Sequence, residues 1–157
     1  MCTYNRANVG MIGFAMSEPN VERELAHPLA MVCSDGGAFA AQGPARRGRP
    51  HPRGLGTFPR VLGHYVRERN VMPLAEAIRK MTAVPAARCG LAGRGTLRAG
   101  AFADVTVFDP ATVADRATFE DPFQYPVGIH VVIVNGVVAL RDGARGPRSG
   151  VALRRST

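Results

Sequence analysis

The sequence predicts an α/β fold, and three patterns along its 157 residues lead to that prediction. Residues 9–35 follow a strand–helix–strand pattern, residues 57–88 carry apolar side chains at helical spacing, and residues 129–143 place two apolar runs around an Asn-Gly pair. Strands separated by a helix-sized connection are typical of a parallel sheet with helices on its faces. A chain of this length is expected to form one domain with a sizeable core.

The first pattern predicts a βαβ unit over residues 9–35. Residues 9–16 are expected to form a short apolar strand, and Ser17 begins a helix that ends near His27, before Pro28. The next apolar run, residues 30–35, is expected to be a buried strand that ends at Asp35. A carboxylate at the C-terminal end of such a strand is where a parallel α/β protein places its chemistry. The alternative is that Asp35 only starts a turn or caps the next segment.

A long loop and two helices are expected next. Residues 36–56 are rich in Gly, Pro and Arg, and loops of this length are commonly functional or disordered. Thr57 is a suitable N-cap for a helix that carries an apolar stripe. Residues 73–82 repeat apolar side chains at helical spacing, and a short helical turn from Pro85 ends at Gly90. The apolar stripe of the first helix consists of Val61, Leu62, Tyr65 and Val66.

The C-terminal part of the sequence predicts strands. Residues 91–100 are expected to form a connector with a short hairpin, and β-branched residues predict a strand over 103–110. After a loop, residues 129–143 give the strongest hairpin signal, because Asn-Gly is the pair that a type I′ turn prefers. The basic tail from Ala144 is expected to be loosely ordered.

Charge and composition limit the classes of function. The net charge is +8, with 20 basic and 12 acidic residues, which alone would favour a nucleic-acid partner. The basic residues are not interleaved with aromatic ones in the Arg46–Arg49 cluster, and no nucleic-acid-binding motif occurs, which argues against that partner. The sequence has no apolar run of membrane-spanning length and no signal-peptide pattern, so a cytoplasmic location is expected.

The three cysteines occur without a CxxC spacing, so neither a disulfide framework nor a structural zinc site is indicated. Cys33 and Cys89 are expected to be reduced and buried, with Cys33 in a packing role.

The order of several short motifs resembles one family. A Ser34-Asp35-Gly36 segment precedes His51-Pro52-Arg53, and further matching segments follow along nearly the whole chain. Together they resemble the C-terminal portion of the N-acyl-D-amino-acid deacylases (D-aminoacylases), within the metal-dependent amidohydrolase superfamily. The further segments are residues 56–63, 77–82, 85–88, 100–110 and 134–136.

The resemblance implies a fold and a set of site residues. Residues 1–90 would be the last βα units of a partial TIM barrel, and residues 91–157 the C-terminal strands of a small β-sandwich with a basic tail. Asp35 would lie at a zinc site as general base and acid. Arg53 would bind the carboxylate of an N-acyl-D-amino acid, with Ser34 and Gly36 beside it. Alternatively, Arg53 is a surface arginine; His51 lies near the site or only spaces the loop.

The sequence departs from that family in its metal ligands. Family members carry a His-x-His motif and further Cys and His ligands, whereas no two histidines here lie within four residues of each other. Zinc needs three or more protein ligands, so Asp35 alone would not hold it. The chain is therefore expected to be an incomplete part, inactive alone, whose partner is an N-terminal barrel segment. A non-catalytic remnant with a structural or interaction role and a basic nucleic-acid binder are the alternatives.

Overall fold

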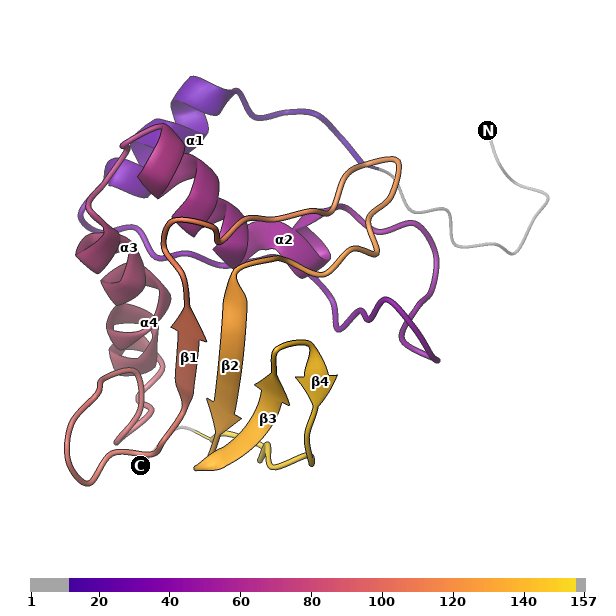
Figure 1. Ribbon diagram of the computed structural model, residues 1–157. Coiled ribbons are helices and arrows are strands. Elements are labelled where there is room, and N and C mark those ends of the chain that lie inside the picture. Colours follow the sequence, from indigo (N-terminus) through magenta and orange to yellow (C-terminus); the bar gives the residue numbers. More distant parts are fainter. Residues whose placement is uncertain (1–11, 155–157) are drawn as a thin grey trace.

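The computed structural model describes residues 12–154 and contains helices beside a four-stranded antiparallel sheet (Figure 1). No helix within this range is long and apolar enough to cross a membrane. The helical elements are α1 (Glu18–Ala26), α2 (Arg53–Arg60), the π-helix η1 (Val61–Glu68), α3 (Leu74–Met81) and α4 (Ala83–Arg88). The strands are β1 (Val105–Phe108), β2 (Ile129–Val134), β3 (Val137–Arg141) and β4 (Ala144–Arg145).

The core lies between η1 and α3. Val61 and Tyr65 of η1 pack with Met72 and Ala77, Val66 packs against this cluster, and Leu62 is also buried. Full burial of one such apolar side chain contributes about 1.5–3 kcal/mol. The predicted helices over this region are therefore confirmed, and their apolar stripe does form the core. The Arg69 N–H donates to the His64 carbonyl at 2.9 Å, an i→i+5 bond typical of a π-helix.

The sheet has the strand order β1-β2-β3-β4 and is antiparallel throughout. Asn135 and Gly136, between β2 and β3, have φ angles of +49° and +80°. Both central residues of a type I′ turn require positive φ, so the predicted hairpin is confirmed. The tail after it is less irregular than expected, because it begins with β4, paired to β3, and the Ser149 hydroxyl donates to the Val134 carbonyl at 2.8 Å.

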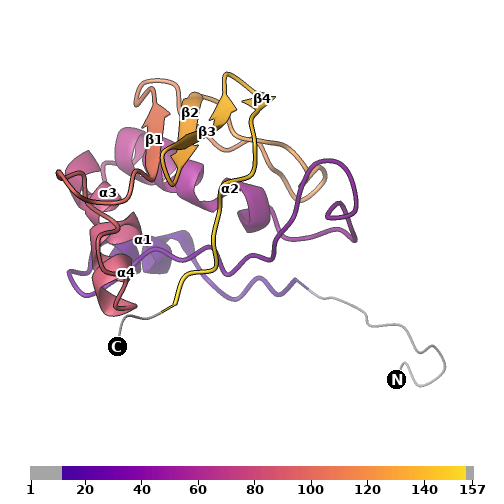
Figure 2. The ribbon, with the colours of Figure 1, turned by 90° about the horizontal axis from the view of Figure 1, so that it is seen from below.

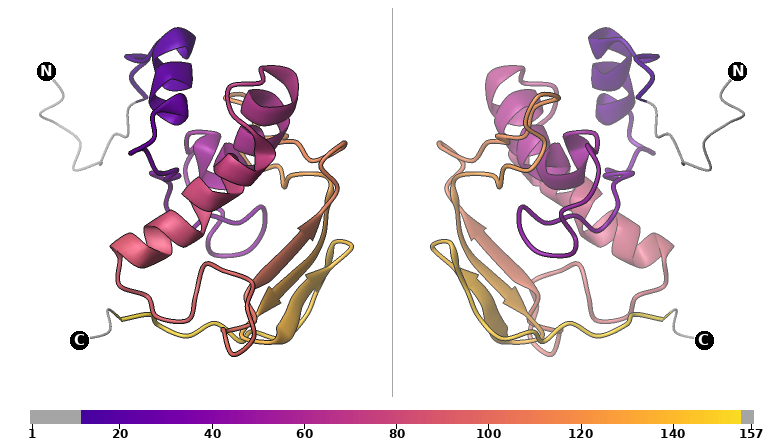
Figure 3. Two further views of the ribbon diagram at one scale, coloured as in Figure 1. Left: turned by 90° about the vertical axis from the view of Figure 1, so that its left-hand side faces the viewer. Right: turned by 90° about the vertical axis from the view of Figure 1, so that its right-hand side faces the viewer.

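The elements form three tiers. The sheet lies on one side, α2–η1 and α3–α4 lie in the middle, and the N-terminal segment with α1 lies on the far side (Figures 2 and 3). The middle tier joins the loop after β1 through Arg67 of η1, which donates to the Val113 carbonyl at 2.7 Å. Gly63 is required at this approach, since a Cβ there would lie 2.6 Å from the same carbonyl oxygen.

The predicted βαβ unit is wrong. Its helix forms as α1, but residues 12–16 and 30–35 contain no strand; residues 9–11 lie outside the described range. A buried parallel strand needs neighbouring strands for its backbone groups, and the described sheet lies on the opposite side of the helices. Residues 30–35 instead run past α3, where the Val32 N–H donates to the Lys80 carbonyl at 3.2 Å.

Two further boundaries differ from the prediction. Helix α2 begins at Arg53, with Pro52 at the N-cap, rather than at Thr57. Thr57 lies within the helix, where its hydroxyl donates to the Arg53 carbonyl at 3.0 Å instead of capping an N-terminus. The expected short hairpin over residues 91–100 is absent; turns occupy it, with positive φ at Gly93, Gly95 and Gly100.

Candidate functional site

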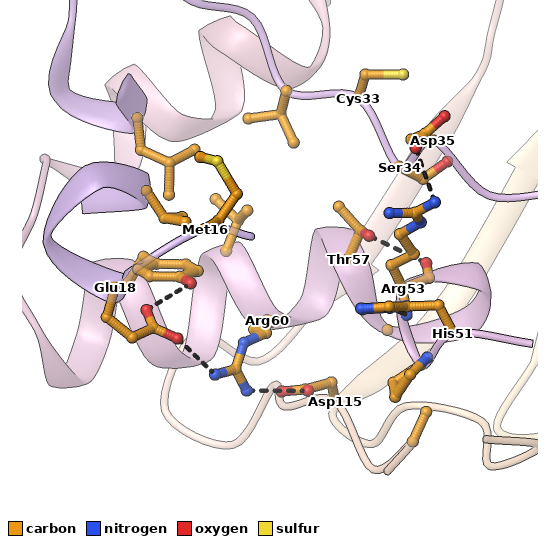
Figure 4. A pocket seen from close by; sticks show the side chains of 18 of the residues that line it. Met16, Glu18, Cys33, Ser34, Asp35, His51, Arg53, Thr57, Arg60 and Asp115 are labelled. Carbon is orange, nitrogen blue, oxygen red and sulfur yellow. Dashed lines mark hydrogen bonds and ion pairs between the residues drawn. The ribbon is translucent and has the colours of Figure 1, made fainter. Parts of the chain in front are cut away.

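The predicted acid–base residue and the predicted substrate-binding arginine lie together. Arg53 Nη2 is 2.8 Å from Asp35 Oδ2, and Figure 4 shows the two side chains pointing toward one another. Arg53 is the first residue of α2, whereas Asp35 lies in a loop with a φ of +46°. The Asp35 side chain is 81% exposed and that of Arg53 is 45% exposed. Water therefore screens the pair, and exposed pairs contribute only about 0–1 kcal/mol.

A close approach of two glycines brings the Asp35 loop to α2. A Cβ on Gly36 would lie 2.9 Å from the Gly54 Cα, so a larger residue at Gly36 would push the loop away from the helix. The Ser34 hydroxyl accepts the Gly36 N–H at 3.3 Å, which closes the turn around Asp35. Ser34 and Gly36 thus shape the position of the carboxylate, and their expected contact with substrate stays a prediction.

His51 lies beside Arg53. The Arg53 N–H donates to His51 Nδ1 at 3.0 Å, and the imidazole meets the Phe119 ring edge-on at a centroid distance of 4.9 Å. Burial and the charge of Arg53 lower the pKa of His51 below its usual 6.5. The ring is therefore neutral at pH 7, with its proton on Nε2, because Nδ1 is already an acceptor.

These groups line a cleft of about 1110 Å³. Its walls are residues 12–18 and 30–35 on one side, and α2 with residues 115–120 on the other. This volume slightly exceeds the usual range for small-molecule sites, roughly 300–1,000 Å³. Its lining combines apolar side chains, such as Val21 and Leu25 of α1, with charged ones, such as Asp35 and Arg53.

A second polar cluster lies across the cleft from Asp35 (Figure 4). Arg60 Nη1 is 3.4 Å from Asp115 Oδ2, and Arg60 Nη2 is 3.8 Å from Glu18 Oε1. The Tyr65 hydroxyl donates to Glu18 Oε2 at 2.9 Å, and burial, together with that bond, raises the pKa of Tyr65. The sequence analysis missed this cluster, because no local spacing connects residues so far apart in the chain.

The described residues do not form a metal-binding cluster. Among residues 12–154, no three His, Cys, Asp or Glu side chains gather where a metal ion would bind. The nearest charged neighbour of Asp35 is the cation Arg53, which competes with a metal ion for the carboxylate. The described residues therefore do not fit a zinc ion by themselves.

Both described cysteines contradict the prediction that they are buried. Cys33 and Cys89 are free thiols and both are exposed. The prediction for Cys33 depended on a buried strand at residues 30–35, and without that strand its side chain has no packed face.

The arginine-rich loop is anchored within the chain. Arg49 donates to the carbonyls of Phe119 at 3.2 Å and Glu120 at 2.6 Å. The Arg46 guanidinium lies 4.3 Å from the centre of the Phe123 ring. These arginines hold the loop against residues 119–123, of which Phe119 and Glu120 line the cleft.

Comparison with known proteins gives the same relatives by sequence and by structure. D-aminoacylase of Alcaligenes xylosoxydans xylosoxydans is 52% identical over 148 residues, which cover 94% of this chain and 29% of that protein. A crystal structure of D-aminoacylase superposes with a TM-score of 0.77 at 49% identity, over 85% of this chain and 27% of the other. The chain thus spans less than a third of the length of these relatives.

A third relative was solved with ligands. It is an N-acyl-D-glutamate deacylase from Bordetella bronchiseptica, complexed with zinc and a phosphonate mimic of the tetrahedral intermediate. It has a TM-score of 0.75 and 50% identity, over 83% of this chain and 26% of its own. A sequence model of the Amidohydrolase family matches residues 45–140, more than half of this sequence, and the chain accordingly belongs to the amidohydrolase family.

Proposed function

We propose that this chain supplies the acid–base carboxylate and the substrate-carboxylate arginine of an enzyme that hydrolyses N-acyl-D-amino acids. The observation that carries the proposal is the Asp35–Arg53 pair at 2.8 Å in a cleft, in a chain about half identical to deacylases of D-amino acids. The products would be a carboxylate and a free D-amino acid.

Each residue of the pair has a chemical role. Asp35 would take a proton from the attacking water and pass it to the leaving amine, as a general base and then a general acid. The Arg53 guanidinium would bind the substrate carboxylate through two parallel hydrogen bonds. Arg53 would exchange Asp35 for the substrate, which frees the Asp35 oxygens for proton transfer. This exchange is easy because the exposed pair is weak.

Neutral His51 would assist this arrangement. Its Nδ1 accepts the Arg53 backbone N–H at 3.0 Å and so fixes the first turn of α2, from which the guanidinium extends. Ser34 and Gly36 would border the bound substrate through the turn that carries Asp35.

The described residues do not supply a complete zinc site. A zinc-activated water would require three or more protein ligands, and the described residues offer Asp35 alone. The other ligands would come from a segment equivalent to the rest of the relatives' length, so this chain would be inactive alone. Residues 1–90 would then complete a TIM barrel, and residues 91–157 a β-sandwich. A cytoplasmic location also stays a prediction.

The test is a chimera in which this chain replaces the matching part of the Alcaligenes D-aminoacylase. We expect zinc in the purified chimera and release of free amine from an N-acetyl-D-amino acid, with none from the isolated chain. Asp35→Asn should lower kcat by about 10²–10⁴-fold, the range for loss of a general base. Arg53→Gln should mainly raise KM. The matched control is Arg47→Gln, which changes an exposed arginine in the loop that precedes α2.

A well-folded chimera that contains no zinc and hydrolyses nothing would favour the non-catalytic alternative. Full activity of the Asp35→Asn chimera would remove Asp35 from the mechanism.

A further inference from the structure

Lys80, the only lysine in the sequence, is buried where a charge is costly. It lies on α3, and its side chain is 1% exposed. Its Nζ donates to the Leu25 carbonyl at 2.5 Å and the His27 carbonyl at 2.6 Å. The nearest carboxylate oxygen, on Glu76, is 4.0 Å away. The ammonium group is thus committed to backbone acceptors rather than to a close ion pair.

Both acceptors belong to the C-terminal end of α1, where the last carbonyls have no partner within the helix. A lysine in this position also interacts favourably with the helix dipole. Lysine caps usually come from the same helix, whereas Lys80 reaches across from α3, more than 50 residues further along the chain. It therefore holds the end of α1 against the middle tier of helices.

The backbone of the same residue holds the other end of the segment that follows α1. The Val32 N–H donates to the Lys80 carbonyl at 3.2 Å. Residues 27–35 form no helix or strand. Besides the Lys80 bonds and the Asp35–Arg53 ion pair, they make only short-range hydrogen bonds among the described residues: the His27 N–H donates to the Glu24 carbonyl, the Leu29 N–H to His27 Nδ1, the Ala30 N–H to the His27 carbonyl, and the Gly36 N–H to the Ser34 hydroxyl. Val32 is the last backbone anchor before Asp35, three residues on.

We propose that Lys80 is a positioning residue: by fixing both ends of the segment from Leu25 to Val32, it sets where Asp35 stands relative to Arg53. The proposal relies on the proposed function only for the catalytic importance of Asp35. Val32 packs against the core, and this contact fixes how deeply Val32 is buried. The hydrogen bonds made by the side chain and by the backbone carbonyl of Lys80 fix the direction in which the chain leaves α1.

The test uses the whole chain and a reporter next to Asp35. With Cys2 and Cys89 changed to Ser, a nitroxide can be attached to the exposed Cys33 thiol. Lys80→Met, which keeps the length but removes the donor, should increase the mobility of the label in its electron paramagnetic resonance spectrum. It should also speed hydrogen exchange of the Val32 amide by about tenfold or more. The backbone carbonyl of residue 80 stays in place, but loss of the charged Nζ bonds to the Leu25 and His27 carbonyls would loosen the segment that ends at Val32.

The matched control is Arg79→Gln. Arg79 is the neighbouring residue on α3, also interacts with Glu76, at 2.7 Å, and is exposed, so its loss should change neither signal. Lys80→Arg keeps a donor at this position, so the mobility of the label should return at least in part toward the lower value found with Lys80. Exchange of the Val132 amide in β2 serves as an internal reference for loss of global stability.

The proposal is overturned if the Lys80→Met protein folds with unchanged label mobility and unchanged Val32 exchange. If Lys80→Met fails to fold, the unmodified chain decides: the proposal requires the Val32 amide to exchange as slowly as amides of α3, and exchange at the rate of an exposed loop overturns it. These signals do not depend on hydrolysis, so an inactive chimera with the expected exchange pattern would reject the proposed function and leave the positioning role standing.

Discussion

Residues 12–35 and the β2–β3 hairpin are both rich in apolar side chains, yet they have opposite outcomes. The hairpin pairs with β1 on one side and β4 on the other. Residues 12–35 contain one helix and no strand, and two of their large apolar side chains, Phe14 and Leu29, are 81% and 84% exposed.

The difference shows that apolar sequence and strand formation are separate requirements. The backbone N–H and C=O groups of a strand need hydrogen-bond partners, and in a hairpin a two-residue turn places the partner strand directly after the first. Apart from the local turn bond of the Ala30 N–H, residues 30–35 find one backbone partner within the described part of the chain, the Lys80 carbonyl, and their apolar side chains gain no sheet to cover. Stability is therefore expected to depend on η1, α3 and the hairpin far more than on residues 12–35.

The largest expected effect follows from truncation of the core. Tyr65→Ala should lower the free energy of unfolding by about 3–5 kcal/mol, as for other buried aromatic side chains. Leu29→Ala should change it by less than about 0.5 kcal/mol, since surface substitutions have little effect. Urea denaturation followed by circular dichroism measures both.

Tyr65→Phe is the control for the polar part of that side chain. It removes only the hydroxyl that donates to Glu18, and should cost about 1 kcal/mol. A Leu29→Ala loss as large as that of Tyr65→Ala would contradict the comparison, because it would show that the Leu29 side chain is packed in solution.

The hairpin turn gives a smaller effect. Gly136 has a φ of +80°, so Gly136→Ala should cost about 1–2 kcal/mol, the penalty for a Cβ in the left-handed region. Open space surrounds Gly136, so the cost comes from backbone strain alone. Gly13→Ala is the matched control in the other region. A Cβ at Gly13 also meets no atom of the described residues within 4 Å, and Gly13 has no positive φ. Equal losses of unfolding free energy in the two variants would refute the turn assignment.

The same contrast explains how far the sequence could predict the molecule. The helices around Tyr65 and the β2–β3 hairpin follow from local spacing and from one dipeptide, and both are present. The strand predicted at residues 30–35 depended on partner strands that the local pattern does not specify. The wrong prediction that Cys33 is buried followed from the same error.

For the site, the resemblance identified Asp35 and Arg53, and the structure brings them to 2.8 Å. Their roles remain predictions. The Glu18–Arg60–Asp115 cluster left no sequence signal, because its three residues come from separate elements that only tertiary packing unites.

The smallest effect concerns pH and His51. Burial and the Arg53 charge lower its pKa in the folded protein, so the unfolded chain binds a proton more readily. Stability should therefore fall as pH drops through the usual histidine value of 6.5, and this contribution should vanish above it. His51→Gln should make the free energy of unfolding less dependent on pH between about 7.5 and 5.5, as measured by urea denaturation at several pH values.

His27→Gln tests which of two features of His51 causes the pH dependence: the bond to a backbone N–H two residues on, or the environment of the cleft. His27 Nδ1 accepts the N–H of Leu29 at 3.3 Å, two residues on, as His51 Nδ1 accepts that of Arg53. It is exposed and, among residues 12–154, has no aromatic contact like that of His51 with Phe119. If the two variants flatten the pH profile equally, the shared backbone bond is responsible. If only His51→Gln does so, the cleft environment near Arg53 lowers the histidine pKa, and the neutral ring beside Arg53 is a property of the assembled cleft.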